Sequence, residues 1–287
     1  MPLVDCAGRT VSYEAAGPDD GTAPLMPFQP PGASGAPIWR SIATALQDRF
    51  RTAAVNPSAY GETDAFAGPE PMTLRDEAAA LAAVIRAELP KCRGERAHIV
   101  GHSYGGTIAL VLALAWPELS GRLTLLEPAP YVLLRDAGET ALADEIGGQN
   151  AQFIATVRAG SRNAEAMEQY LDYFNNRPGF WQGLDGRSQQ KMLTLAERLA
   201  VGLDAVERLD MRVADLAAID VPVTVVRGGD TDPLHARLSE LVAQAIPGAT
   251  LIDLPGAGHM MTLTHGAEIA GMLRETACSD QPGYSPR

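Results

Sequence analysis

Short apolar runs alternate along this chain with longer segments in which apolar residues recur every three or four positions. A short run rich in β-branched residues and closed by Gly, Pro, Asn or Asp is typical of a strand, whereas the longer period is typical of an amphipathic helix. The short runs predict strands at 3–6, 10–14, 24–29, 51–55, 97–100, 122–126, 221–226 and 250–254. The longer segments predict helices at 39–48, 73–89, 107–115, 234–246 and 264–276. Strand and helix therefore alternate through most of the chain.

One helix has a clear start and end in the sequence. Thr73 is a candidate N-cap, and Asp76 stands three residues later, where a capping box requires it. Apolar residues between 74 and 85 share one face, and Pro90 ends the pattern. We expect an amphipathic helix over 73–89.

The alternation of strand and helix predicts the fold class. Parallel strands joined by helices form a sheet that is covered on both faces. In such sheets the ligand site lies at the carboxyl ends of the strands. Ser103 and Glu127 each follow a predicted strand and should lie at that edge. We predict an α/β core formed by residues 1–130 and 216–278.

A strand-poor segment at 131–215 interrupts this core. It predicts helices at 141–157, 163–174 and 189–209, and we expect it to form an inserted helical cap over the site. The segment is rich in aromatic residues, among them Tyr173, Phe180 and Trp181. These three side chains are candidates to line an apolar substrate pocket, with packing of the cap onto the core as the alternative.

Composition limits the class of protein further. The 287 residues carry a net charge of −12, which disfavours nucleic acid and anionic membranes as partners and favours solubility. Three widely spaced cysteines argue against a disulfide framework or a zinc site. Because the sequence shows no secretory signal and no long apolar run, we expect a soluble cytoplasmic protein. We leave oligomer formation open, and we expect a flexible tail at 279–287.

The hexapeptide Gly-His-Ser-Tyr-Gly-Gly at 101–106 carries the strongest chemical signal. It stands between a predicted strand and a long apolar helix, as the G-x-S-x-G nucleophile elbow requires. Glycines two positions before and after Ser103 let strand and helix approach closely. Ser103 is therefore our candidate nucleophile.

A serine nucleophile needs a base, and the base needs a carboxylate. His259 follows a glycine-rich turn after the last strand, where the order Ser, acid, His places the base. Two positions qualify for the acid: Glu127 after the strand at 122–126, and Asp232 in the turn after the strand at 221–226. We leave these two open, with a slight preference for Glu127, and Asp230 is a weaker third.

The site also needs two amides that converge on the developing negative charge. The loop at 30–35 follows a strand and is expected to supply one, but Pro30 and Pro31 have no N–H. Our candidates for the oxyanion hole are the backbone amides of Gln29 and Tyr104.

These motifs together resemble the α/β-hydrolase superfamily. The elbow at 101–105 and the histidine loop at 256–259 match the pattern, and the resemblance covers nearly the whole chain. It implies a mostly parallel eight-stranded sheet with helices on both faces, a helical cap, no cofactor or metal, and hydrolysis through an acyl-enzyme.

Two groups within the superfamily resemble this chain in part. Haloalkane dehalogenases and fungal zearalenone lactonases have a glutamate after the sixth strand, as Glu127 does here, although a serine nucleophile argues against dehalogenase and epoxide-hydrolase chemistry. Pro-Gly-Ala-Ser at 31–34 is similar to the same loop of carbon–carbon bond hydrolases. We therefore expect a serine hydrolase for an ester or lactone of a small, fairly apolar molecule. The alternatives are a carbon–carbon bond hydrolase, a lyase or cyclase on the same triad, and a non-catalytic ligand-binding protein.

Overall fold

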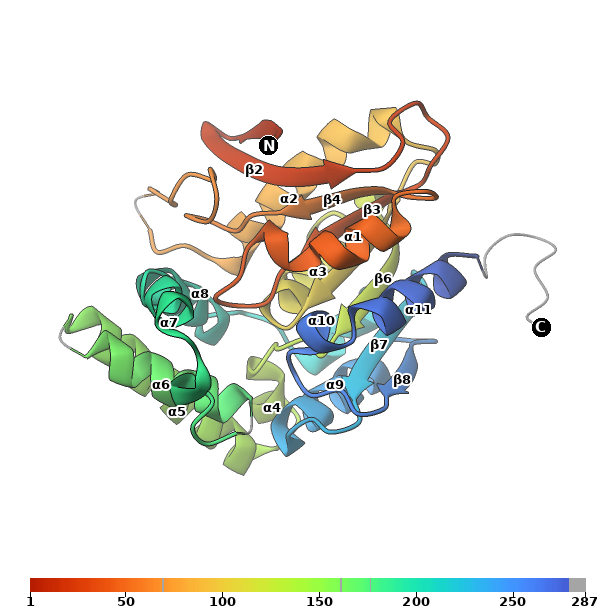
Figure 1. Ribbon diagram of the computed structural model, residues 1–287. Coiled ribbons are helices and arrows are strands. Elements are labelled where there is room, and N and C mark those ends of the chain that lie inside the picture. The colour runs from red at the N-terminus through yellow and green to blue at the C-terminus, as the bar shows by residue number, and fades with distance from the viewer. Residues whose placement is uncertain (69, 161, 176, 279–287) are drawn as a thin grey trace.

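An eight-stranded sheet forms the centre of the molecule (Figure 1). The computed structural model describes residues 1–68, 70–160, 162–175 and 177–278, so the expected tail at 279–287 lies outside the described residues. The strands are β1 (Leu3–Cys6), β2 (Arg9–Ala16), β3 (Leu25–Gln29), β4 (Arg51–Val55), β5 (Ala97–His102), β6 (Ser120–Leu126), β7 (Val223–Gly228) and β8 (Thr250–Leu254). Their order is β1-β2-β4-β3-β5-β6-β7-β8; β2 is antiparallel to both of its neighbours, β1 and β4, and all other neighbouring strands are parallel. The predicted fold class is confirmed.

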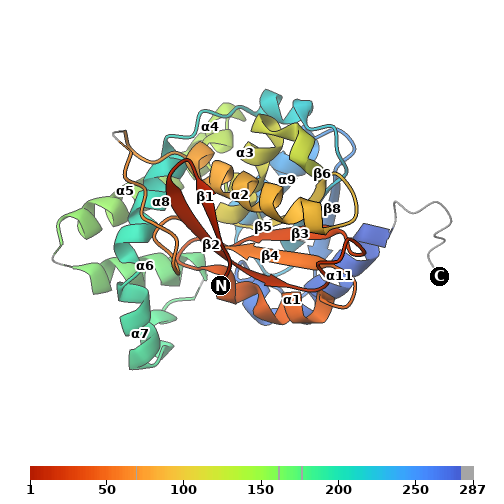
Figure 2. The same ribbon diagram turned by 90° about the horizontal axis from the view of Figure 1, so that it is seen from above.

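Helices cover both faces of the sheet (Figure 2). The core helices are α1 (Arg40–Leu46), α2 (Leu74–Glu88), α3 (Tyr104–Ala115), α9 (Pro233–Ala245), α10 (Met261–Thr264) and α11 (Gly266–Cys278). Short 3₁₀ helices occur at Ala36–Trp39, Leu89–Lys91, Pro117–Leu119, Trp181–Gly183 and Val213–Ala218. The capping box of α2 is confirmed, because Thr73 accepts from the amide of Asp76 and the Asp76 carboxylate accepts from the amide of Thr73. None of the helices in the described ranges is long and apolar enough to cross a membrane.

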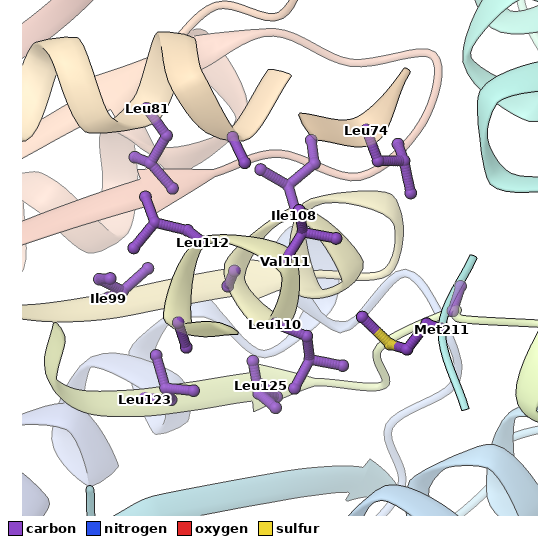
Figure 3. Close-up of a cluster of buried hydrophobic side chains, with 14 of the residues drawn as sticks. Leu74, Leu81, Ile99, Ile108, Leu110, Val111, Leu112, Leu123, Leu125 and Met211 are labelled. Atoms are coloured by element: carbon purple, nitrogen blue, oxygen red, sulfur yellow. The ribbon is translucent and has the colours of Figure 1, made fainter. Parts of the chain in front are cut away.

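Two apolar clusters hold the helices to the sheet. The larger one joins α2 and α3 to the face formed by β5 and β6, with Leu112 of α3 between Leu81 and Ile99 (Figure 3). The smaller one joins α1 and α11 to the opposite face. Because α3 is buried along nearly its whole length, the turn that precedes it is held in a fixed place.

A block of helices is inserted between β6 and β7, as the strand-poor segment predicts. Its members are α4 (Val132–Asp136), α5 (Thr140–Arg158), α6 (Asn163–Phe174), α7 (Gly186–Leu193) and α8 (Ala196–Glu207). In Figure 1 the helices α5 to α8 extend to one side of the sheet. We call residues 132–207 the inserted helices.

The prediction of a single helix at 189–209 is wrong, because the helix is interrupted at Thr194 and two helices, α7 and α8, form instead. The Thr194 hydroxyl donates to the carbonyl oxygen of Lys191, and Leu195 turns inward and is buried. The break has a packing reason: α8 buries one apolar face, whereas α7 buries none of its residues. Apolar period alone does not reveal such a change of direction.

The close approach of backbone at Gly105 in the elbow leads to a testable prediction about stability. A Cβ at Gly105 would lie 2.3 Å from the carbonyl oxygen of Gln29. We expect Gly105→Ala to lower the free energy of unfolding by about 3 kcal/mol, because backbone would have to move. Gly271→Ala is the matched control: nothing lies within 4 Å of its Cβ position on α11, and a gain of about 0.5–1 kcal/mol is expected. Urea unfolding of both variants checks this, and a Gly105→Ala variant as stable as the parent would contradict it.

Candidate active site

Ser103 occupies a strained turn between β5 and α3. Its backbone has φ 53° and ψ −117°, a conformation that side chains other than glycine rarely adopt. Neighbouring elements hold it there: its amide donates to the carbonyl oxygen of Leu126, and its own carbonyl accepts from the amides of Thr107 and Ala129. The turn therefore projects the hydroxyl from the carboxyl edge of the sheet in a fixed direction.

Glu127 is the first residue after β6 and is fully buried. It also has a positive φ, of 39°, and its amide donates to the carbonyl oxygen of Val226 on the neighbouring strand. The amide of Gly228 donates to Glu127 Oε1 at 2.7 Å, and the Thr231 hydroxyl donates to Oε2 at 3.0 Å. The carboxylate is thus held by two donors before any histidine is considered.

His259 lies in the loop after β8, and His102 fixes that loop to the elbow. His102 Nε2 donates to the carbonyl oxygen of His259 at 2.7 Å, while its Nδ1 lies 3.1 Å from the Thr262 hydroxyl. Both ring nitrogens of His102 are therefore engaged in hydrogen bonds that hold this loop.

The three side chains form a hydrogen-bonded chain. Nε2 of His259 lies 3.0 Å from Ser103 Oγ, and Nδ1 of the same ring lies 2.7 Å from Glu127 Oε2. With Nδ1–H donating to the carboxylate, Nε2 is free to accept the serine proton. All three residues are buried, with Ser103 8% and His259 7% exposed.

Asp232 has a different position from the one an acid partner of His259 would need. It is the N-cap of α9: its Oδ1 accepts from the amide of His235, and its Oδ2 lies 2.6 Å from Nδ1 of His235. Both oxygens are used within its own turn. Of the two acids left open by the sequence, the structure brings Glu127 to His259, and Asp230 is exposed.

Burial and nearby charges set the ionisation states of His259 and Glu127. Burial lowers the pKa of His259, and the nearby His235 ring lowers it further, more than the hydrogen bond to Glu127 raises it. Burial alone would raise the pKa of Glu127, but the hydrogen bond from His259 and the amide of Gly228 outweigh it and leave the pKa below its usual value. Near neutral pH the arrangement is a neutral imidazole beside an ionised carboxylate.

The two oxyanion candidates lie on either side of the elbow. Tyr104 is the first residue of α3, so its amide belongs to the first turn, whose N–H groups have no partner within the helix. Gln29 ends β3, and its carbonyl oxygen lies against the Gly105 backbone. These positions are compatible with the predicted oxyanion hole.

A cavity of about 480 Å³ opens beside Ser103. Its aromatic lining is Tyr60, Phe66, Tyr104, Tyr131 and Tyr170. The Tyr104 hydroxyl is buried and has no hydrogen-bond partner among the described residues. Charged side chains also line the cavity. Among them are Arg198, which lies over the ring of Tyr60, and Glu77, whose pKa burial raises to about 7.

The predicted pocket residues need correction. Trp181 packs inside the inserted helices with Phe153 and Met167, in their own apolar cluster. The Tyr173 hydroxyl donates to Glu145, away from the cavity, and Phe180 is absent from its described lining. Aromatic content marks the inserted helices as apolar but does not say which face meets the substrate.

One residue near the reacting groups was not singled out by the sequence. His235 is 1% exposed and stacks on His259. A signal for its orientation does exist in the sequence, because Asp-Pro-x-His places an N-cap carboxylate within reach of a histidine at the third helical position. Among the described residues, Glu127, His235 and His259 also have the spacing of metal ligands, but their donor atoms are largely engaged in hydrogen bonds.

The sheet topology, with a serine on a strand-to-helix turn, defines an α/β enzyme of the hydrolase class. The chain belongs to the alpha/beta hydrolase family, whose model it matches over residues 30–272. It is 30% identical over 203 residues to a pimeloyl-[acyl-carrier protein] methyl ester esterase of Neisseria meningitidis, covering 69% of this chain and 74% of that protein.

Solved structures share the fold. A hydrolase from Pseudomonas aeruginosa aligns with a TM-score of 0.76 at 22% identity, over 97% of this chain and 98% of the other. The enol-lactonase from Burkholderia xenovorans aligns with a TM-score of 0.72 at 20% identity, over 96% and 99% of the two chains.

Proposed function

We propose that the protein is a serine hydrolase that cleaves an ester or lactone of a small, fairly apolar molecule. The observation that carries this proposal is the continuous hydrogen-bonded chain from Ser103 through His259 to Glu127. Two comparisons support the same chemistry. One sequence relative is named as a methyl ester esterase, and one solved structure of the same fold is named as an enol-lactonase.

The proposed mechanism uses each side chain at a defined atom. Ser103 Oγ attacks the carbonyl carbon while its proton passes to Nε2 of His259, and Glu127 stabilises the imidazolium that forms. The amides of Tyr104 and Gln29 bind the oxyanion. The intermediate collapses, the leaving alcohol takes the proton from His259, and an acyl-enzyme is left. Water then attacks the acyl carbon, gives its proton to His259, and releases the acid as Ser103 regains its proton.

The cavity supports a small substrate with both apolar and polar parts. Its volume falls within the range of ordinary small-ligand pockets. Four tyrosine rings supply flat apolar surface, and the unpartnered Tyr104 hydroxyl offers a hydrogen bond to a polar group. The inserted helices act in this proposal as a cap, since Tyr170 and Arg198 line the cavity from that side.

A substrate panel tests the reaction class. Short-chain p-nitrophenyl esters, small lactones and a vinylogous 1,5-diketone should be compared at equal concentration. We expect turnover of esters or lactones. Cleavage of the diketone alone would favour the carbon–carbon bond hydrolase, and turnover of none by a chain that binds them would favour the ligand-binding protein.

The pH dependence of kcat/KM follows from the lowered pKa of His259. A general base acts when neutral, so activity is lost as pH falls through that pKa. The acid limb should therefore lie below the usual histidine value of about 6.5. Glu77→Gln is the control, because Glu77 titrates near 7 in the same cavity and its removal should leave that limb in place. A limb at or above pH 6.5 in both proteins would contradict the assignment.

A further inference from the structure

The imidazole of His235 lies flat against the imidazole of His259. The ring centroids are 3.6 Å apart and the ring planes meet at 24°. His235 stands in the first turn of α9, whereas His259 comes from the loop after β8. Two histidines from different elements are thus in face-to-face contact, and one of them is the proposed general base.

Asp232 fixes the orientation of the His235 ring. Its Oδ1 accepts from the His235 amide at 3.0 Å, and its Oδ2 lies 2.6 Å from Nδ1 of the ring. The pairing leaves the pKa of Asp232 at about 2, although burial alone would raise it. The carboxylate is therefore ionised whenever the enzyme works, and it holds the proton of His235 on Nδ1.

The other nitrogen of His235 faces a closed environment. Nε2 is buried and has no hydrogen-bond partner among the described residues, and the rings of Tyr131 and Phe174 lie 6.4 Å and 5.6 Å away. A proton on Nε2 would find no acceptor there, so we take Nε2 as the lone-pair nitrogen. The titratable groups around the ring are Asp232, His259, Glu127, Tyr131 and His102.

We propose that Asp232 and His235 form a second carboxylate–imidazole pair, which positions the ring of His259. The stacked ring restricts rotation of His259 out of the plane that joins Ser103 and Glu127. Asp232 contributes by holding the stacked ring of His235 in a fixed orientation. His235 is thus a positioning residue, and its role rests on the function proposed for His259.

The first test replaces the charge and keeps the shape. Asp232→Asn should retain the cap, since the amide oxygen can still accept from the His235 amide. Loss of the negative charge weakens the hydrogen bond that orients the His235 ring, so the ring should stack less firmly on His259 and kcat should fall several-fold with KM unchanged. The NMR signals of the His259 ring protons sense the stacked ring and should shift in the absence of substrate, so this result does not depend on which substrate is found.

Asp185→Asn is the matched control. Asp185 caps α7 through the amides of Arg187 and Ser188, but it is exposed and belongs to a helix with no buried residues. It should leave the NMR signals of the His259 ring and kcat unchanged. Unchanged His259 ring signals in Asp232→Asn, or the same change in both variants, would overturn the proposal.

A second variant tests the stacking itself. His235→Gln keeps a donor for Asp232 and removes the ring. Because His235 is not among the residues that line the cavity, we expect kcat to fall about tenfold with KM unchanged. A kcat equal to that of the parent in a folded variant would overturn the positioning role, and a rise in KM alone would assign His235 to substrate binding instead.

Discussion

Glu127→Gln is expected to lower kcat by about 10⁴-fold, by analogy with the loss on the same change of the acid in a serine protease. The amide of Gln would present either a donor or a weaker acceptor to Nδ1 of His259, which disturbs the tautomer that keeps Nε2 free for the proton of Ser103. The imidazolium would also lose its adjacent negative charge. Steady-state kinetics on the best substrate of the panel measure the loss.

Two control variants make this prediction specific. Asp232→Asn should cost about tenfold or less, because Asp232 has no hydrogen bond to His259 and acts only through His235. Glu145→Gln changes an exposed glutamate of the inserted helices and should leave kcat unchanged. Equal, small losses of kcat in Glu127→Gln and Asp232→Asn would exclude both residues as the carboxylate partner of His259 and would leave Asp230 as the candidate.

Ser103→Ala is expected to lower kcat by about 10⁴ to 10⁶-fold. Ser103 Oγ makes its hydrogen bond to His259, and the turn itself is held through backbone bonds to Leu126 and Thr107, which alanine keeps. The fold should therefore survive, and urea unfolding should show a change within about 1 kcal/mol. Ser34→Ala is the control, since Ser34 lines the same cavity and its loss should change kcat only a few-fold. Full activity in Ser103→Ala would exclude a serine nucleophile.

The sequence predicted the elements because each has a local signal. The capping box at Thr73 and Asp76, the buried run of α3 and the glycine-bounded elbow all depend on residues close together in the chain. The topology followed from the alternation of strand and helix. The family match and the solved relatives confirm this part.

The choice between Glu127 and Asp232 needed contacts between distant segments. Gly228 and Thr231 hold the Glu127 carboxylate from a loop about one hundred residues later in the chain, and no local pattern encodes that. Asp232 is occupied by its own helix start and by His235, which the Asp-Pro-x-His pattern indicates only once the helix boundary is known.

Which aromatic residues line the cavity also depends on contacts between distant segments. Trp181 is apolar and stands beside a break in the chain, which suits both a pocket wall and a packed interior. The structure places it in the interior of the inserted helices, whereas Tyr170, eleven positions earlier, reaches the cavity. The decision depends on how the helices turn relative to the sheet.

Covalent labelling with a fluorophosphonate, read by intact mass on the parent protein and on Ser103→Ala, tests the central claim most directly. The reagent reacts with a serine only when a neighbouring base activates it. An activated Ser103 predicts one adduct on the parent and none on Ser103→Ala. A folded parent without an adduct, or an adduct that persists in Ser103→Ala, would contradict the proposed nucleophile.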